Sequence, residues 1–191
     1  MAERDRLTRE EGEELISLAR KTIEAELFGG GSPPEEGMEI TPEFLDKRGT
    51  FVTLTMNGGL RGCIGNIIPR ESVLEGVKKN ALNAAFEDPR FRPLTAEEWE
   101  RVRVEVSILS DPRPLPYETP EDLLNKLKPG VHGVIIRKGM RQSTFLPQVW
   151  EQLPDKSEFL THLCLKAGLD GDAWRKDPLE VFTYEVQAFE E

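Results

Sequence analysis

The fold is decided by the stretch Thr50-Phe51-Val52-Thr53-Leu54-Thr55-Met56-Asn57-Gly58-Gly59-Leu60-Arg61-Gly62-Cys63-Ile64-Gly65, which predicts two strands and a tight turn. Residues 50–56 are rich in β-branched side chains, which favour a strand. Asn57-Gly58 favours a two-residue hairpin turn, because both of its residues readily adopt positive φ. We therefore expect residues 60–65 to return antiparallel to residues 50–56.

The segments around this hairpin predict further helices and strands. Thr8 and Glu11 have the spacing of a capping box, and Val102, Val104 and Val106 alternate with polar residues as in a half-buried strand. By similar arguments we expect helices at 8–28, 71–86, 121–127 and 157–167. We expect a strand at 102–108, a second hairpin at 131–146 turning at Lys138-Gly139, and a final strand at 179–189 with Phe182, Tyr184, Val186 and Ala188 on one face. Between these elements we expect a loop at 29–49, an irregular segment at 88–93 and a stiff connector at 111–120. This order indicates an α+β fold with a mostly antiparallel sheet and flanking helices.

Size and composition limit the class of protein. The 191 residues suit one domain or two small subdomains with a shared core. Apolar runs are far shorter than the roughly 20 residues of a membrane-spanning helix, and Met1-Ala2-Glu3-Arg4-Asp5 lacks the features of a signal peptide. Two cysteines, Cys63 and Cys164, give no disulfide framework. We therefore expect a soluble cytoplasmic protein that has no membrane contact.

The net charge of −10 is unevenly distributed. Residues 1–47 hold 6 basic and 13 acidic side chains, whereas residues 123–150 hold five basic and no acidic ones. The overall sign argues against a protein that coats nucleic acid, because such affinity comes mostly from neutralised phosphates. The basic segment is either an anion-binding patch or an ordinary solvated hairpin.

The returning strand is unusual because it contains Gly62 and Gly65, which cost stability and supply no packing. They indicate that something approaches the backbone closely or that the strand kinks. Regular alternation would put Arg61 and Cys63 on one face, about 7 Å apart, where the guanidinium would favour the thiolate. The alternative is a small buried cysteine packed against a helix.

Other chemistry is weakly indicated. The glycines at 59, 62 and 65 match no nucleotide-phosphate loop, and the histidines and cysteines lack the spacing of a metal site. Cys63 and His162 form a thiol–imidazole pair only if folding brings them together. Asp88 and Arg90 are either a local ion pair or a turn that presents Arg90 as an anion contact. No cofactor and no metal are implied.

Several segments also resemble the AMMECR-type domain family. The hexapeptide Leu60-Arg61-Gly62-Cys63-Ile64-Gly65 matches the signature of that family letter for letter. Further similarities follow in family order at residues 83–91, 93–94, 106–109, 130–134, 143–150 and 163–169, so the resemblance covers essentially the whole chain. Ser143 is a departure, because the family more often has Ala there.

The resemblance implies a single AMMECR-type domain over residues 1–191, built from two unequal, interleaved subdomains, the smaller inserted in the larger. It implies a cytoplasmic protein similar to component A of a three-part system with a Memo-like protein and a radical S-adenosylmethionine enzyme. It supplies no agreed reaction, and it marks the hexapeptide as the functional site.

Two hypotheses follow. The first is a binding or accessory protein whose Leu60–Gly65 strand forms a site for a partner or a small anionic ligand, together with the candidate binding residues Gly62, Gly65, Asp88, Arg90 and Phe91. The second is a thiol-dependent enzyme, in which Cys63 is the nucleophile or redox group and Arg61 and Arg90 contact an anion.

Overall fold

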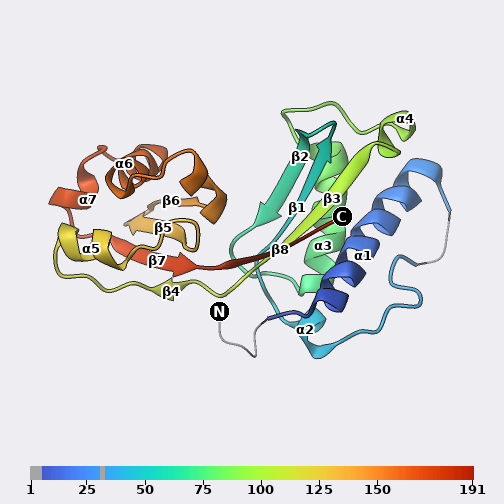
Figure 1. Cartoon of the computed structure of the whole chain (residues 1–191), viewed down its shortest axis with the longest axis horizontal. Coiled ribbons are helices and arrows are strands. Elements are labelled where there is room, and N and C mark those ends of the chain that lie inside the picture. Colours follow the sequence, from blue (N-terminus) through green and yellow to red (C-terminus); the bar gives the residue numbers. More distant parts are fainter. Residues whose placement is uncertain (1–5, 31–32) are drawn as a thin grey trace. The chain divides into compact units, whose positions relative to one another are not determined.

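A computed structural model describes residues 6–30 and 33–191 and shows two compact units (Figure 1). Unit 1 comprises the chain up to Leu109 together with Gln187–Glu191, and unit 2 comprises Ser110–Val186. The α+β fold with two unequal, interleaved subdomains is therefore confirmed. The N-terminal residues 1–5 and part of the loop expected at 29–49, residues 31–32, lie outside the described residues.

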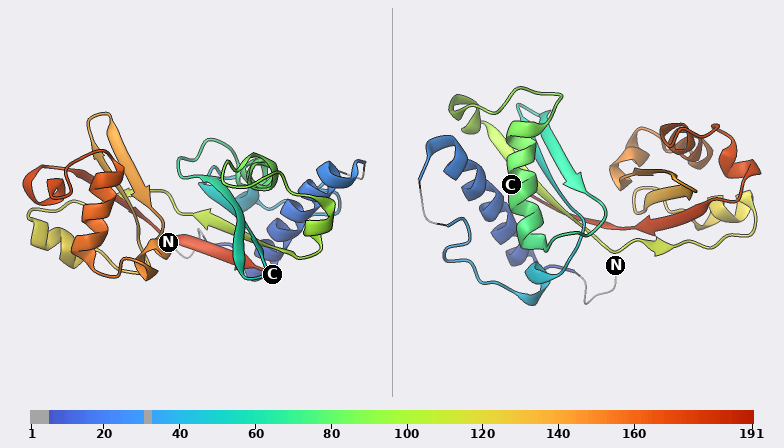
Figure 2. Two further views of the ribbon diagram at one scale, coloured as in Figure 1. Left: turned by 90° about the horizontal axis from the view of Figure 1, so that it is seen from above. Right: turned by 180° about the vertical axis from the view of Figure 1, so that it is seen from behind.

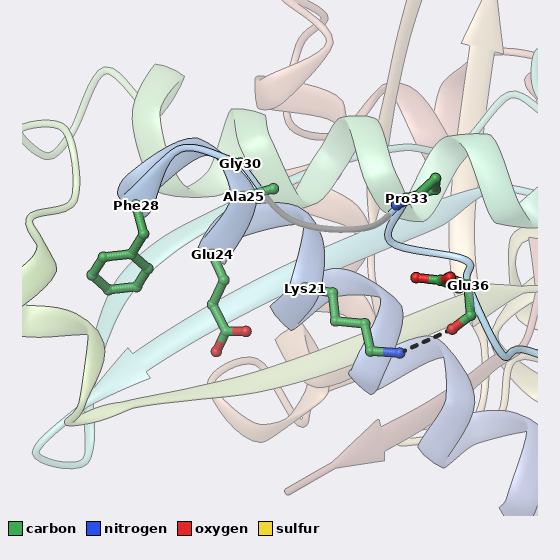
Figure 3. A pocket seen from close by; sticks show the side chains of 7 residues that line it. All are labelled: Lys21, Glu24, Ala25, Phe28, Gly30, Pro33 and Glu36. Atoms are coloured by element: carbon green, nitrogen blue, oxygen red, sulfur yellow. Dashed lines mark hydrogen bonds between the residues drawn. The ribbon is translucent and has the colours of Figure 1, made fainter.

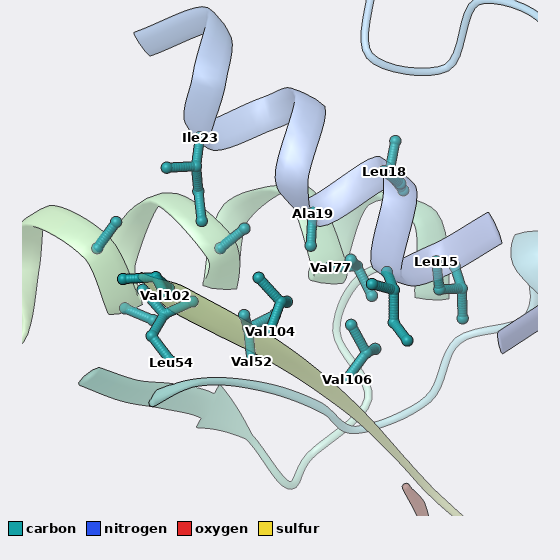
Figure 4. Close-up of a cluster of buried hydrophobic side chains, with 14 of the residues drawn as sticks. Leu15, Leu18, Ala19, Ile23, Val52, Leu54, Val77, Val102, Val104 and Val106 are labelled. Atoms are coloured by element: carbon teal, nitrogen blue, oxygen red, sulfur yellow. The ribbon is translucent and has the colours of Figure 1, made fainter. Parts of the chain in front are cut away.

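Unit 1 is a four-stranded sheet in the order β2-β1-β3-β8, with two helices over one face (Figures 2 and 4). Its elements are α1 (Arg9–Phe28), α2 (Pro42–Leu45), β1 (Thr50–Met56), β2 (Gly59–Asn66), α3 (Val73–Leu82), a π-helix η2 (Asn83–Glu87), α4 (Ala96–Trp99), β3 (Val102–Leu109) and β8 (Val186–Glu190). Between the sheet and helices α1 and α3 lies a core of fully buried aliphatic side chains that includes Leu15, Ala19, Val52, Leu54, Val77 and Val104.

Local sequence signals account for most of unit 1. Helix α1 begins at the expected capping box, in which Thr8 and Glu11 each accept the other's backbone N–H. Asn57 and Gly58 have φ of 54° and 77°, as the hairpin turn between β1 and β2 requires. The helix expected at 71–86 continues from α3 into η2, which ends before the irregular segment at Asp88.

Unit 2 is built on a second four-stranded sheet in the order β4-β7-β5-β6. Its elements are β4 (Arg113–Pro114), α5 (Pro120–Lys126), β5 (Gly133–Lys138), β6 (Arg141–Phe145), a 3-10 helix η3 (Pro147–Glu151), α6 (Lys156–Lys166), α7 (Ala173–Lys176) and β7 (Glu180–Tyr184). At its core the Trp150 and Phe159 rings are stacked, with centroids 3.6 Å apart.

Four expectations differ from the structure. The strand expected at 179–189 is two strands in two sheets, β7 and β8, interrupted at Glu185. Its predicted apolar face is therefore only partly right: Tyr184 is buried as expected, but Ala188 is exposed and Val181, expected on the other face, is buried. The short helix α2 lies in the expected loop, and β4 lies in the expected connector. The second hairpin turns at Gly139-Met140, because Lys138 already pairs with Arg141. No helix in the described part of the chain has the length and apolar character needed to span a bilayer.

Candidate functional site

The returning strand β2 contains a β-bulge at Arg61. Thr55 pairs with Leu60, but Leu54 pairs with Gly62, so Arg61 is an extra residue with no partner in β1. A bulge of this kind shifts the alternation of every following side chain. Regular pairing after the Asn57-Gly58 turn would have placed Cys63 opposite the buried Val52.

The bulge instead places Cys63 opposite Thr53, on the face of the sheet that the helices do not cover. Cys63 is half-buried, and the Thr53 hydroxyl hydrogen-bonds its Sγ at 3.4 Å. Two expectations are therefore wrong. Arg61 and Cys63 are not two alternating residues of one regular strand face, and Cys63 is not a buried cysteine packed against a helix.

The two strand glycines have close neighbours within the same chain. A Cβ on Gly62 would lie 2.1 Å from the carbonyl oxygen of Ala84 in η2, and a Cβ on Gly65 would lie 2.2 Å from the Phe51 ring. The expected close approach to the backbone is thus present, and the expected kink is present as the bulge. Both glycines have a packing role, and a role in ligand binding stays a prediction.

The irregular turn after η2 places two charged side chains on the edge of β2. The Asp88 carboxylate accepts the backbone N–H of Cys63 at 2.9 Å, and the Arg90 guanidinium donates to the backbone carbonyl of Cys63 at 3.1 Å. Together they occupy the positions that a neighbouring strand would fill, because β2 is an edge strand.

Asp88 and Arg90 also bind each other closely. Arg90 donates from Nε and Nη2 to the two Asp88 oxygens at 2.9 and 2.6 Å. These bonds hold the pKa of the fully buried Asp88 carboxyl well below its usual range. They also raise the pKa of Arg90, to which Cys63 makes a smaller contribution. The local ion pair expected from the sequence is therefore present, and it fixes a half-exposed arginine beside Cys63.

Arg61 pairs with a different carboxylate. Its Nε and Nη2 donate to the two Glu98 oxygens at 3.1 and 2.8 Å, and Nη2 also donates to the Arg92 carbonyl at 2.9 Å. The bond from Arg61 lowers the pKa of Glu98. The bonds thus commit the Arg61 guanidinium to Glu98, whereas the arginine whose hydrogen bonds reach Cys63 is Arg90.

Phe91 completes the cluster. Its ring centroid lies 5.8 Å from Cζ of Arg61 and 5.5 Å from Cζ of Arg90, so the ring contacts both guanidinium groups. All five candidate binding residues, with Arg61 and Cys63, therefore lie on β2 and the turn that follows η2.

The remaining candidates belong to unit 2. His132, His162 and Cys164 all lie there, and burial raises the pKa of the Cys164 thiol. The Cys63–His162 pair stays a prediction. Within residues 6–30 and 33–191, no group of three or more His, Cys, Asp or Glu side chains is placed to hold a metal ion.

The basic segment 123–150 has acidic partners from outside its own sequence. Arg137 pairs with Glu180 at 2.7 Å, and Lys138 pairs with Asp177 at 2.6 Å. These pairs favour the interpretation of the segment as a solvated hairpin over that of an anion-binding patch.

Sequence reasoning missed two residues that shape the site, Glu98 and Thr53. Thr95 and Glu98 have capping-box spacing, which was a visible helix signal but gave no link to Arg61. Thr53 could not be assigned to Cys63, because the bulge sets that pairing.

Two surface hollows have none of the candidate site residues in their linings. One of about 380 Å³ is lined by residues of α1 and the following loop, where Lys21 donates to the Glu36 carbonyl (Figure 3). The other, of about 760 Å³, lies in unit 2 between residues 114–120 and 174–182. The cluster on β2 and the turn after η2 is therefore not part of either hollow.

Comparison with known proteins shows what the chain is similar to. The AMMECR1 family model matches residues 16–189. The chain belongs to the AMMECR1 family. Among AMMECR1 relatives, a protein from Methanosarcina acetivorans is 44% identical over 97% of this chain and 94% of its own length, and protein MK0488 from Methanopyrus kandleri is 42% identical over 98% and 91%. The crystal structure of uncharacterized protein PH0010 from Pyrococcus horikoshii matches with a TM-score of 0.84 at 38% identity, covering 97% of this chain and 93% of that one.

Proposed function

We propose that this AMMECR1 chain is a cytoplasmic binding or accessory protein, whose ligand or partner site is formed by Leu60–Gly65 and the turn after η2. The observation that carries the proposal is that the Arg90 side chain is exposed and yet held in a fixed position. Its side chain is 53% exposed, yet Asp88 and the Cys63 carbonyl hold it in place. None of the described residues accepts a hydrogen bond from its Nη1.

An exposed donor that is already held in position suits recognition. Arg90 loses little side-chain freedom when a partner binds, so less of the binding energy is spent on ordering it. The neighbouring Phe91 adds aromatic surface, and arginine and aromatic side chains supply much of the affinity at protein interfaces. The cluster therefore has the composition and the rigidity of a small interaction site.

The partners to test first are a Memo-like protein and a radical S-adenosylmethionine enzyme, because the family resemblance implies them. Each is copurified with the unmodified chain and with the variants Arg90→Gln and Phe91→Ala. The matched control is Arg92→Gln, since the Arg92 side chain is exposed and only its backbone carbonyl contacts Arg61.

We expect Arg90→Gln and Phe91→Ala each to weaken binding by about tenfold or more, as loss of an interface anchor does. Arg92→Gln should change it by less than about twofold. Phe91→Ala keeps the Asp88–Arg90 pair, so it separates loss of recognition from loss of folding. Unchanged binding in both variants, or no binding of either protein to the unmodified chain, contradicts the proposal.

The alternative, a thiol-dependent enzyme, is favoured by one observation: Cys63 is half-buried on the uncovered sheet face, next to Arg90. A nucleophilic thiol needs a base or a cation to form thiolate. The test is alkylation of the folded chain near neutral pH, read by peptide mass spectrometry. Rapid labelling of Cys63 supports the alternative, whereas labelling no faster than in the unfolded chain removes it.

A further inference from the structure

Arg61 has a donor that nothing in the described chain satisfies. Its side chain is only 9% exposed, and Nε and Nη2 are bound to Glu98 and the Arg92 carbonyl. Its Nη1 is buried and makes no hydrogen bond among the described residues. Buried polar groups in native proteins nearly always have a partner, so this atom indicates an acceptor that binds from outside the chain.

Phe91 lies close to this buried donor and also to a second one at the surface. Its ring contacts both the Arg61 and the Arg90 guanidinium groups. An aromatic ring attracts a cation but accepts an N–H only weakly, so it does not replace an oxygen acceptor for Arg61 Nη1. Arg90 Nη1 is likewise without an acceptor among the described residues. Two guanidinium groups, each with an Nη1 that has no acceptor among the described residues, therefore lie close to one half-buried ring.

We propose that Arg61 and Arg90 together bind a carboxylate group, whose oxygens accept hydrogen bonds from the two Nη1 groups, while Phe91 packs against the apolar part of the same ligand. Because Arg61 Nη1 is buried, the ligand reaches it only when neighbouring side chains move aside. This inference rests on the proposed function, because it names the ligand chemistry of that site.

The local charge selects a carboxylate over a phosphate. Arg61 is already paired with Glu98, and Arg90 with Asp88, so these four side chains are neutral in sum. A carboxylate adds one negative charge beside the two acids, whereas a phosphate dianion adds two and is repelled more strongly. The planar pair of carboxylate oxygens also matches guanidinium N–H groups. The carboxylate belongs either to a free small acid or to a Glu or Asp side chain of a protein.

The experiment follows the arginine Nε–H signals of the full chain by NMR during titration. The probes are phenylacetate, its neutral counterpart phenylacetamide, inorganic phosphate, and the peptide acetyl-Gly-Glu-Phe-amide. We expect phenylacetate and the peptide to shift the Arg61 and Arg90 signals, and phenylacetamide and phosphate to leave them unmoved. Arg90→Lys keeps the charge beside Asp88 but lacks Nη1, so it should weaken binding about tenfold, as loss of one charge-assisted hydrogen bond does. The control Arg92→Lys should change it less than about twofold.

Each outcome decides the inference. Shifts with both acids, or with the peptide alone, support it; the second result identifies a protein side chain as the source. Shifts with phosphate as well reject the selection of carboxylate. If neither acid shifts Arg61 and Arg90, or phenylacetamide shifts them equally, the inference is overturned and Arg61 Nη1 binds only a structural water. The copurification test is separate from the titration. Capture of a partner that depends on Phe91, without carboxylate binding, keeps the proposed function and rejects this inference. Carboxylate binding without capture of a partner keeps this inference and rejects the proposed partners.

Discussion

The packing role of Gly62 gives a sharp test of how β2 and η2 fit together. In Gly62→Ala the new Cβ would lie 2.1 Å from the Ala84 carbonyl oxygen, although real Cβ atoms essentially never approach closer than 3.0 Å. Strand and helix must therefore separate by about 0.9 Å, and neither side of the contact is a flexible side chain. We expect the cost to lie at the upper end of the range for overpacked sites, about 3 kcal/mol.

Calorimetric unfolding measures this cost. For a chain of 191 residues, about 3 kcal/mol corresponds to a fall in Tm of about 6–12 °C. The matched control is Gly59→Ala in the same strand, where the nearest atom to the new Cβ is the Met56 carbonyl oxygen at an ordinary 3.7 Å. Its Tm should change by no more than about 2 °C. If Gly62→Ala is as stable as Gly59→Ala, then η2 does not pack on Gly62 and the glycine has another purpose.

Three further predictions concern buried polar groups. The pKa of Asp88 is lowered in the folded chain, so its charge contributes stability that is present above the unfolded pKa near 4 and is lost as the pH falls further. The difference in urea unfolding free energy between the unmodified chain and Asp88→Asn should therefore shrink below pH 4. A difference that stays constant with pH contradicts this. Burial raises the pKa of Tyr184 to about 12, so its stabilising contribution is present below pH 10 and is lost between pH 10 and 12. In an ultraviolet titration of the folded chain, one of the two tyrosines should therefore ionise only near pH 12. Tyr184→Phe should remove that step. Asn80 donates from Nδ2 to the Thr50 carbonyl and hydroxyl and to Asn66 Oδ1. Asn80→Asp replaces this donor with an acceptor, so the free energy of unfolding in urea should fall by about 3 kcal/mol. A fall below about 1 kcal/mol would show that the strand tolerates an acceptor there.

The parts of the fold that the sequence predicted correctly have strong local signals. A capping box begins α1, Asn57-Gly58 turns the first hairpin, and alternating valines form β3. Each signal acts within a few residues, so it does not depend on distant contacts. The strand expected at 179–189 failed for the opposite reason. Its composition is continuous, and only the division of the chain between two sheets interrupts it at Glu185.

For the candidate site, too, the sequence predicted local features but not the contacts between distant residues. Two glycines in one strand indicated a close contact or a kink, and the structure has both; the Asp88–Arg90 pair was likewise expected as one of two alternatives. The position of the bulge, at Arg61, could not be predicted, because the sequence of β2 alone does not reveal where its register shifts against β1. That register shift places Cys63 on the face of the sheet that the helices do not cover. The Arg61 guanidinium binds Glu98, which lies 37 residues away in the sequence.

The central claim is that β2 and the turn after η2 form the recognition site of this AMMECR1 chain. Amide hydrogen exchange, compared between the free chain and its complex with a copurified Memo-like protein or radical S-adenosylmethionine enzyme, tests it most directly. We expect slower exchange at residues 60–66 and 88–92 in the complex, with helix α1 unchanged. Slower exchange elsewhere in the chain, with residues 60–66 and 88–92 unchanged, would contradict it.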